Sequence, residues 1–318
     1  MFRILRIFLV VFISFQSVCF AQSIKPQLRA KLRKEGVRQF ELPIHDQNKE
    51  WLLENFSQGA TKYPININLL LRNIIWQQRQ ERVFDKKPLF DGNIRSFWYA
   101  YIKGTLAEAG VLNPDFDQYN SLIKQLTKLI KDADVMRYKD IGFMDDNKHR
   151  KIIGENYHII VFAEKEGQFP FLMRLNKKYG VTVISLGGVP SLLSAEYFID
   201  DMKAKGIDVR QKFYLFSLVD YDPSGSVVRN SFVDHLRFYG IKTVEVFDLV
   251  RLDLLTEEEL NKRKYPLPKG TETKNKNWLK KTNGINGELY GLETEALHPK
   301  HIEELLVEKI EPLMGKQK

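Results

Sequence analysis

Residues 213–225 read FYLFSLVDYDPSG, an apolar run that ends in an acidic turn. Three comparable runs stand along the chain: 158–163 (HIIVFA), 181–186 (VTVISL) and 243–249 (TVEVFDL). Helix-forming segments separate the runs, and strands that alternate with helices predict a parallel sheet with helical crossovers. Because most of the runs are continuously apolar, both faces of the strands should be covered. We therefore expect an α/β domain with a C-terminal extension over residues 151–318.

The part of the chain that precedes this domain has a helical pattern. Its helix-forming segments are 24–38, 51–56, 65–82, 96–109 and 119–132. Short helices with polar turns between them are typical of a helix-turn-helix or winged-helix module, although any small helical bundle would show a similar pattern. We expect a mainly α, winged-helix-like domain over residues 22–150.

The composition narrows the class of protein. The chain has 318 residues, of which 43% are hydrophobic and 28% charged, as in soluble globular proteins. This balance excludes a disordered chain, a collagen-like fibre and a multi-span membrane protein. The single cysteine excludes an intramolecular disulfide and a cysteine-rich zinc site. The 49 basic residues exceed the 40 acidic ones, and the net charge of +9 favours a polyanionic partner such as nucleic acid.

Acidic side chains follow two of the predicted strands. Glu164 comes directly after the first run, and Asp220 and Asp222 follow the third. The carboxyl ends of parallel strands meet at one edge of a sheet, and three carboxylates there repel one another unless a cation lies between them. Hard oxygen ligands suit Mg²⁺ or Mn²⁺. The alternatives are two unrelated polar strand ends or a nucleotide-binding loop, but no glycine-rich phosphate-binding motif follows any strand.

Four stretches together resemble a known family. They are Phe162–Lys165 (FAEK), Leu186–Pro190 (LGGVP), Val219–Gly225 (VDYDPSG) and Gly291–Leu297 (GLETEAL). In order and spacing they are similar to the A subunit of topoisomerase VI, whose family includes the meiotic double-strand-break protein. The resemblance implies a TOPRIM domain preceded by a winged-helix domain. It also implies Glu164, Asp220 and Asp222 as magnesium ligands and catalytic residues. Lys165 is implied as a further catalytic residue, with Gly188 and Glu295 beside the site.

The resemblance breaks down at the family's catalytic tyrosine. The stretch that matches the family's Tyr-Tyr pair is Arg72–Trp76 (RNIIW), with Ile75 and Trp76 in the tyrosine positions. Neither side chain can act as an oxygen nucleophile, which favours hydrolytic cleavage over covalent transesterification. In a hydrolytic site Glu166 or Lys165 would assist the attacking water or stabilise the leaving oxygen, and the sequence does not choose between them.

Nearby tyrosines are weak substitutes for that nucleophile. Tyr63, Tyr99 and Tyr101 are the candidates, and the aromatic alternation predicts core packing for two of the three.

The basic residues complete the functional hypothesis. Arg72 matches the family's basic residue and is expected at a DNA phosphate, as are Lys274, Lys276 and Lys280 in the C-terminal extension, although a solvated surface would look the same. We expect a magnesium-dependent, DNA-acting protein that cleaves strands by hydrolysis. The alternatives are a topoisomerase-like subunit that acts by transesterification with a partner ATPase, and a non-catalytic DNA-binding subunit.

Partners and location follow from the same hypothesis. DNA is the expected partner, the family implies a homodimer with a separate ATPase or complex subunit, and no small-molecule cofactor is expected. Residues 1–21 have the pattern of a signal peptide: two arginines, an apolar run and small residues at the end. That pattern conflicts with DNA chemistry. A wrongly assigned start, a membrane tether or export to extracellular DNA would reconcile the two, and we favour a cytoplasmic, DNA-associated protein.

Overall fold

The structure, a computed structural model, describes residues 25–59, 62–83, 92–112, 118–269 and 272–314. The signal-like segment 1–21 lies outside the described residues. The chain divides into two units, Met1–Met144 and Asp145–Lys318, so the division lies six residues before the expected boundary at 150/151. Among the described helices, none is both long and apolar enough to span a membrane.

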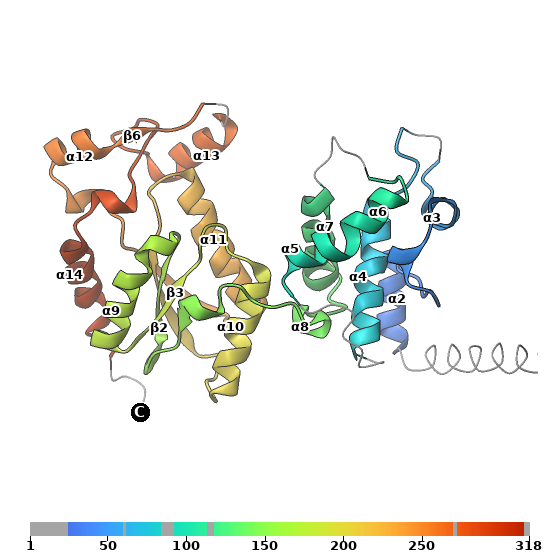
Figure 1. The fold of residues 1–318 in the computed structure, drawn as a ribbon. Coiled ribbons are helices and arrows are strands. Elements are labelled where there is room, and N and C mark those ends of the chain that lie inside the picture. Colours follow the sequence, from blue (N-terminus) through green and yellow to red (C-terminus); the bar gives the residue numbers. More distant parts are fainter. Residues whose placement is uncertain (1–24, 60–61, 84–91, 113–117, 270–271, 315–318) are drawn as a thin grey trace, which may run out of the picture. The chain divides into compact units, whose positions relative to one another are not determined.

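The N-terminal unit is built from helices (Figure 1). They are α2 (Pro26–Lys34), α3 (Lys49–Phe56), α4 (Ile67–Val83), α5 (Ile94–Ser96), α6 (Gly104–Glu108), α7 (Gln118–Thr127) and α8 (Tyr138–Ile141). π-helical turns at Phe97–Lys103 and Lys128–Asp132 join α5 to α6 and extend α7. Eight of the 17 residues of α4 are buried, which makes it the central helix of the unit. Within the described residues of this unit there is no named strand, and one isolated bridge pairs Ser57 with Ile65.

The C-terminal unit contains a five-stranded, mostly parallel sheet, as the apolar runs predict. Its strands are β1 (Lys151–Ile152), β2 (Asn156–Ala163), β3 (Val181–Ser185), β4 (Lys212–Leu218) and β5 (Thr243–Asp248). They lie in the order β1-β3-β2-β4-β5, and β1 alone runs antiparallel to its neighbour. The sequence did not predict β1, because two residues form no recognisable apolar run. The mixed α/β class with helical crossovers is confirmed.

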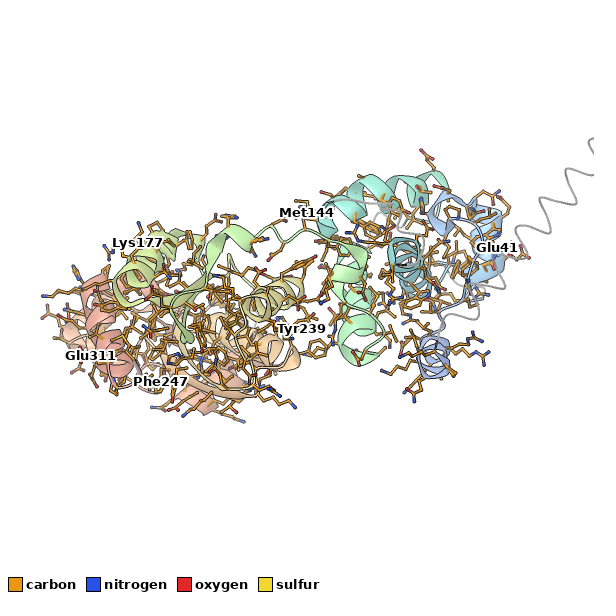
Figure 2. The ribbon with its side chains drawn as sticks, turned by 90° about the horizontal axis from the view of Figure 1, so that it is seen from below. Glu41, Met144, Lys177, Tyr239, Phe247 and Glu311 are labelled. Atoms are coloured by element: carbon orange, nitrogen blue, oxygen red, sulfur yellow. The ribbon has the colours of Figure 1, made fainter. Side chains whose placement is uncertain are left out.

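Helices cover both faces of this sheet (Figure 1). The helices of the unit are α9 (Phe169–Tyr179), α10 (Leu192–Ala204), α11 (Pro223–Phe238), α12 (Glu257–Arg263), α13 (Glu272–Thr282) and α14 (Pro299–Ile310), and a small ribbon is made of β6 (Tyr265–Pro266) and β7 (Tyr290–Gly291). Alternate side chains of β2 divide between the two cores: Ile159 and Val161 pack against α9 and α14, whereas Ile160 and Phe162 pack against α10 and α11. The side chains drawn in Figure 2 fill the space between these layers.

Candidate metal and DNA site

The sheet order places a ligand-binding position at the carboxyl ends of β2 and β4. The chain passes from β2 through α9 to β3 on one side, and then through α10 to β4 on the other side of β2. In open parallel sheets this reversal of direction leaves a crevice at the carboxyl ends of the two central strands. Glu164 directly follows β2, and Asp220 stands two residues after β4. Two predicted residues therefore lie at the switch point of the sheet.

A backbone bridge brings a distant acidic stretch to the same place. Tyr221 and Leu292 exchange two backbone hydrogen bonds, at 2.9 and 3.1 Å, so that residues 293–295 lie beside Asp220. Thr294 then donates both its backbone N–H and its hydroxyl to Asp220 Oδ1, each at 2.8 Å. One carboxylate oxygen of Asp220 is thus fixed, which leaves Oδ2 directed elsewhere.

Asp220, Glu293 and Glu295 form what we call the acidic cluster. Each offers one carboxylate oxygen, and these oxygens lie within 4.8 Å of one another. The Lys165 ammonium lies among them, 3.1 Å from Asp220 Oδ2 and 2.7 Å from Glu295 Oε2, and it also pairs with Glu293. An internal cation therefore offsets part of the repulsion between the three carboxylates.

The contacts between Lys165 and the acidic cluster shift the pKa values of Lys165 and Glu295. Burial alone would lower the pKa of Lys165, but hydrogen bonds to Glu293, Glu295 and Asp220 outweigh burial and hold that pKa above its ordinary value. Burial acts to raise the pKa of Glu295, yet its hydrogen bond with Lys165 leaves this pKa lowered. Gln168 adds a hydrogen bond to Glu295 at 3.1 Å. Lys165 and Glu295 therefore favour each other's charged forms.

Glu164 lies within electrostatic reach of the acidic cluster. Burial, and then the charges of Asp220 and Asp222, raise the pKa of Glu164 above its ordinary value. Its Oε2 atom is buried and makes no hydrogen bond to any part of the chain that the structure describes. The Gly188 N–H donates to the Glu164 carbonyl at 2.8 Å, so Gly188 fixes the backbone on which Glu164 stands. A buried carboxylate oxygen without a donor is what a cation would satisfy.

Asp222 has a structural role at the start of α11. Its Oδ1 accepts a hydrogen bond from the Gly225 N–H at 2.6 Å, as the N-cap of the helix, and its Oδ2 accepts one from the Tyr265 hydroxyl at 2.8 Å. Gly225 is required because a Cβ there would lie 2.1 Å from the Asp220 carbonyl oxygen. The same turn therefore presents Asp220 to the acidic cluster and begins α11.

The predicted and observed sets of acids overlap without being the same. Of the predicted ligands Glu164, Asp220 and Asp222, the structure places Asp220 in the acidic cluster and Glu164 beside it. The sequence reasoning missed Glu293 and named Glu295 only as a neighbour. The available signal was the Glu-x-Glu spacing in the GLETEAL stretch, which the resemblance had already singled out.

The predicted DNA-binding lysines lie on α13, which packs against α11. Lys274 donates to Ser224 Oγ at 3.1 Å, two residues from Asp222, while Lys276 and Lys280 are exposed. Trp278 is buried and donates its indole N–H to Ser226 Oγ at 3.0 Å. Trp278 therefore anchors α13 to α11. Lys274 lies beside the acidic turn, and Lys276 and Lys280 are exposed on another side of α13.

The two residues that stand in the family's tyrosine positions lie in the core of the N-terminal unit. Ile75 and Trp76 are buried in α4, and the Arg79 guanidinium lies 4.9 Å from the centre of the Trp76 ring. Arg72, the predicted phosphate contact, donates to Gln125 Oε1 at 3.1 Å, and its side chain is 17% exposed. Arg72 thus joins α4 to α7.

The three other tyrosines differ from the prediction. Tyr101 packs against the ring of Phe97 at 5.0 Å, but Tyr63 and Tyr99 are 40% and 50% exposed. The expectation that two of the three pack in the core was therefore wrong. The buried places in this π-helical turn are taken by Phe97 and Trp98 instead.

Comparison with known proteins finds no family model and no curated protein that matches the chain. The structure by itself shows a mixed α/β unit with a mostly parallel sheet and a preceding helical unit. The TOPRIM and winged-helix assignments remain predictions that rest on the four sequence stretches.

Proposed function

We propose that the chain is a magnesium-dependent, DNA-acting protein of the topoisomerase VI A/TOPRIM type that cleaves DNA strands by hydrolysis. One observation carries the proposal: Glu164 and the acidic cluster meet at the switch point of a mostly parallel sheet. On this proposal the C-terminal unit is a TOPRIM domain. The helical unit is a winged-helix-like domain that binds DNA.

The residues at this edge fit a divalent cation. The acidic cluster offers three carboxylate oxygens within 4.8 Å of one another, and Glu164 adds a buried oxygen without a hydrogen-bond donor among the described residues. Asp220, Glu293, Glu295 and Glu164 would hold Mg²⁺, and the same hard oxygen donors would accept Mn²⁺. When bound there, the metal would neutralise phosphate charge and orient the reacting oxygens.

The contacts favour Lys165 over Glu166 as the residue that assists the reaction. Glu166 is exposed and pairs with Arg150, away from the acidic cluster. Lys165 lies among the carboxylates and keeps its proton at neutral pH. An ammonium at this place would stabilise negative charge that develops on a phosphate or a leaving oxygen.

Hydrolysis is favoured over transesterification by the burial of Ile75 and Trp76. Both side chains lack an oxygen, and their places in the core of the helical unit leave no room for a reacting phosphodiester. Water is then the nucleophile, and no covalent protein–DNA link forms.

The exposed lysines of α13 support DNA as the substrate. Lys274 contacts Ser224 at the start of α11, and Lys276 and Lys280, one helical turn apart, are exposed on another side of α13. Lysines beside an acidic site would bind backbone phosphates and bring a phosphodiester to the carboxylates. Cutting both strands needs two such sites, so we infer a homodimer; a separate ATPase or complex subunit and a cytoplasmic, DNA-associated location belong to the same proposal.

Supercoiled plasmid tests the proposal directly. The purified chain is incubated with plasmid and Mg²⁺, with and without protease treatment before electrophoresis. We expect nicked and linear DNA in both lanes, no cleavage with chelator, and no cleavage by Asp220→Ala. DNA breaks that appear only after protease would contradict hydrolysis, because they would show a covalent link to a tyrosine.

A non-catalytic DNA-binding subunit is the second candidate. The observation that favours it is Lys165, whose ammonium already offsets the charge of the acidic cluster without a metal. That candidate predicts DNA binding without cleavage under every metal condition. Intact plasmid together with a mobility shift would therefore select it over the nuclease.

A further inference from the structure

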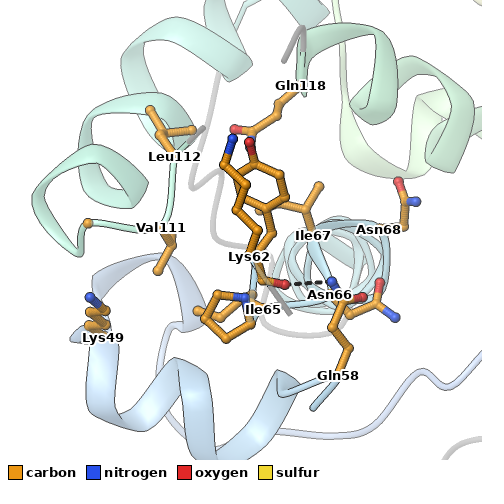
Figure 3. A pocket seen from close by; sticks show the side chains of 13 residues that line it. Lys49, Gln58, Lys62, Ile65, Asn66, Ile67, Asn68, Val111, Leu112 and Gln118 are labelled. Atoms are coloured by element: carbon orange, nitrogen blue, oxygen red, sulfur yellow. Dashed lines mark hydrogen bonds between the residues drawn. The ribbon is translucent and has the colours of Figure 1, made fainter. Parts of the chain in front are cut away.

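The N-terminal unit contains a pocket that the proposed cleavage site does not use. It has a volume of about 610 Å³ and lies between the start of α3, the segment 62–68 that leads into α4, and residues 110–112 after α6 (Figure 3). Pockets that bind small molecules typically measure about 300–1,000 Å³. The volume is therefore suited to a ligand of moderate size.

Backbone hydrogen bonds fix one wall of the pocket. The Gln58 N–H donates to the Pro64 carbonyl at 2.8 Å, and the Asn66 N–H donates to the Phe56 carbonyl at 2.9 Å. The Gln58 side chain also donates to the Tyr63 carbonyl at 2.6 Å. The segment that carries Lys62 is thus attached to the end of α3 and does not depend on a ligand for its conformation.

The charge of the pocket is positive. Lys49 and Lys62 belong to its lining, and no acidic residue does among the described lining residues. Neither lysine pairs with a carboxylate of the chain as far as the structure describes it, and the Lys62 ammonium lies 5.3 Å from the centre of the Tyr63 ring. The first residues of α4 also line the pocket, so the positive end of a 17-residue helix faces the same space. This arrangement favours an anion.

A buried amide adds a second, independent indication of a ligand. The residue Gln118 is 5% exposed and lines the pocket, and its carboxamide is not among the described polar atoms that are buried without a partner, so it opens onto the pocket space. Figure 3 shows its side chain directed into the pocket. An amide that opens onto a pocket can both donate to and accept from a ligand there. The ligand should therefore carry hydrogen-bonding groups as well as negative charge.

The remaining wall is apolar. Ile65, Ile67, Val111 and Leu112 contribute aliphatic side chains to the lining. A ligand that fits this pocket combines a phosphate for the lysines, hydrogen-bonding edges for Gln118 and a flat apolar surface for the aliphatic wall. A nucleotide has all three properties, whereas inorganic phosphate and an aliphatic acid each lack at least one.

We propose that this pocket binds a nucleotide, whose phosphate is attracted by the positive charge of Lys49 and Lys62 and whose base lies against the aliphatic wall. Two sources have this chemistry: a free nucleoside monophosphate, and the 5′-phosphorylated terminal nucleotide of a DNA strand. The inference concerns the N-terminal unit alone and does not depend on cleavage at the acidic cluster.

Calorimetric titration of the full chain tests the proposal with AMP, adenosine and a 5′-phosphorylated hexanucleotide. We expect saturable binding of AMP, of the hexanucleotide or of both, and at least about tenfold weaker binding by Lys49→Ala and by Lys62→Ala. Adenosine, which has no phosphate, should show no dependence on the lysines. Binding of AMP identifies a free nucleotide, and binding of the hexanucleotide alone identifies a strand end.

Matched variants separate a specific pocket from general electrostatics. Lys34→Ala removes an exposed lysine of α2 outside the pocket and should leave the affinity unchanged. Gln118→Leu keeps the buried volume and should weaken nucleotide binding, and its melting temperature shows whether it folds. The proposal is overturned if neither phosphorylated probe binds, or if the lysine variants bind as tightly as the parent chain. Asp220→Asn should bind the nucleotide normally, so a failed nuclease claim and a failed pocket claim give different results.

Discussion

The acidic cluster of the C-terminal unit carries its own counter-ion, whereas the pocket of the N-terminal unit gathers cations without acids. In the acidic cluster, Lys165 contacts three carboxylates, and each charge has a partner of opposite sign. In the pocket, Lys49 and Lys62 lie on the lining with no described acidic residue beside them. The comparison shows that charge alone does not identify a binding site. A polar group that lines a site and is available to a ligand is the better indication.

The polar group that is available to a ligand differs between the two regions. At the carboxyl ends of the strands the unmet group is Glu164 Oε2, an acceptor that calls for a cation or a donor. In the pocket the corresponding polar group is the Gln118 carboxamide, which lines the space and can both donate to and accept from a ligand. The first region should therefore bind metal, and the second should bind a phosphorylated organic ligand.

Removal of one charge from the acidic cluster should have the largest effect. Asp220→Asn keeps an oxygen that can accept from Thr294 but loses the negative charge, so plasmid cleavage should fall at least about 100-fold. Asp248→Asn is the matched control, because Asp248 ends β5 and pairs with Arg229 outside the acidic cluster. Equal cleavage by both variants would remove the acidic cluster from the chemistry.

Loss of the α13 lysines should have the next largest effect, on DNA affinity. The triple variant Lys274→Ala, Lys276→Ala and Lys280→Ala should bind duplex DNA at least about tenfold more weakly at low salt. Each phosphate contact contributes roughly 0.9 to the slope of log affinity against log salt, so the slope should become shallower by up to about 2.7.

A second lysine triple provides the control for that measurement. Lys177, Lys203 and Lys205 are exposed and lie at or just beyond the ends of the crossover helices α9 and α10, which return toward the amino ends of the strands; Lys177 is labelled in Figure 2. Their replacement by alanine should leave the salt slope unchanged. A similar loss in both triples would mean that net charge, and not the α13 surface, binds DNA.

Tyr265→Phe should have a smaller effect on cleavage. The Tyr265 hydroxyl donates to Asp222 Oδ2, and Asp222 caps the helix that begins beside Asp220. Without that donor, cleavage should fall by about tenfold and the free energy of unfolding by about 0.5–1.5 kcal/mol. Unchanged kcat with lower stability would restrict Tyr265 to a structural role. Tyr290→Phe, in the strand paired with β6, is the matched control.

The smallest predicted effect is on the pH dependence of stability, and it comes from a histidine that lies outside both regions. His158 on β2 is buried, and burial lowers its pKa below the ordinary value of 6.5 despite a hydrogen bond to the Leu313 carbonyl. Below pH 6.5 the unfolded chain therefore binds more protons at this position than the folded chain does. The free energy of unfolding falls as the pH drops from 6.5 through the lowered pKa, and the contribution of His158 is fully present above pH 6.5.

The His158→Phe variant checks that sign. Its melting temperature should lose part of its dependence on pH below 6.5, by a few degrees, whereas His149→Phe at an exposed position should keep the parent profile. Parent-like dependence in His158→Phe would assign the effect to other groups.

The sheet was predictable because its signal is local. The four apolar runs match β2 to β5, and most of their ends agree to within two residues. They could be recognised because a buried parallel strand must be apolar on both faces. Glu164 and Asp220 were predictable for the same reason, because Glu164 directly follows β2 and Asp220 stands two residues after β4. The two-residue β1 carries no such pattern.

The full acidic cluster was not predictable from local pattern. Glu293 reaches Asp220 only through the backbone bridge between Tyr221 and Leu292, which joins segments far apart in the sequence. Asp222 was predicted as a metal ligand together with Asp220, but the Asp222 N–H bonds the Asp220 carbonyl in a tight turn and its carboxylate caps α11. The pocket of the N-terminal unit was also not predictable, because it is assembled from turns and helix ends that share no motif.

Manganese binding tests the central claim most directly. Mn²⁺ is titrated into the chain in the absence of DNA, and free Mn²⁺ is followed by electron paramagnetic resonance. We expect saturable binding that competes with Mg²⁺, survives in Asp248→Asn and is lost in Asp220→Asn. Absence of such binding, or its persistence in Asp220→Asn, would contradict a metal site at the acidic cluster.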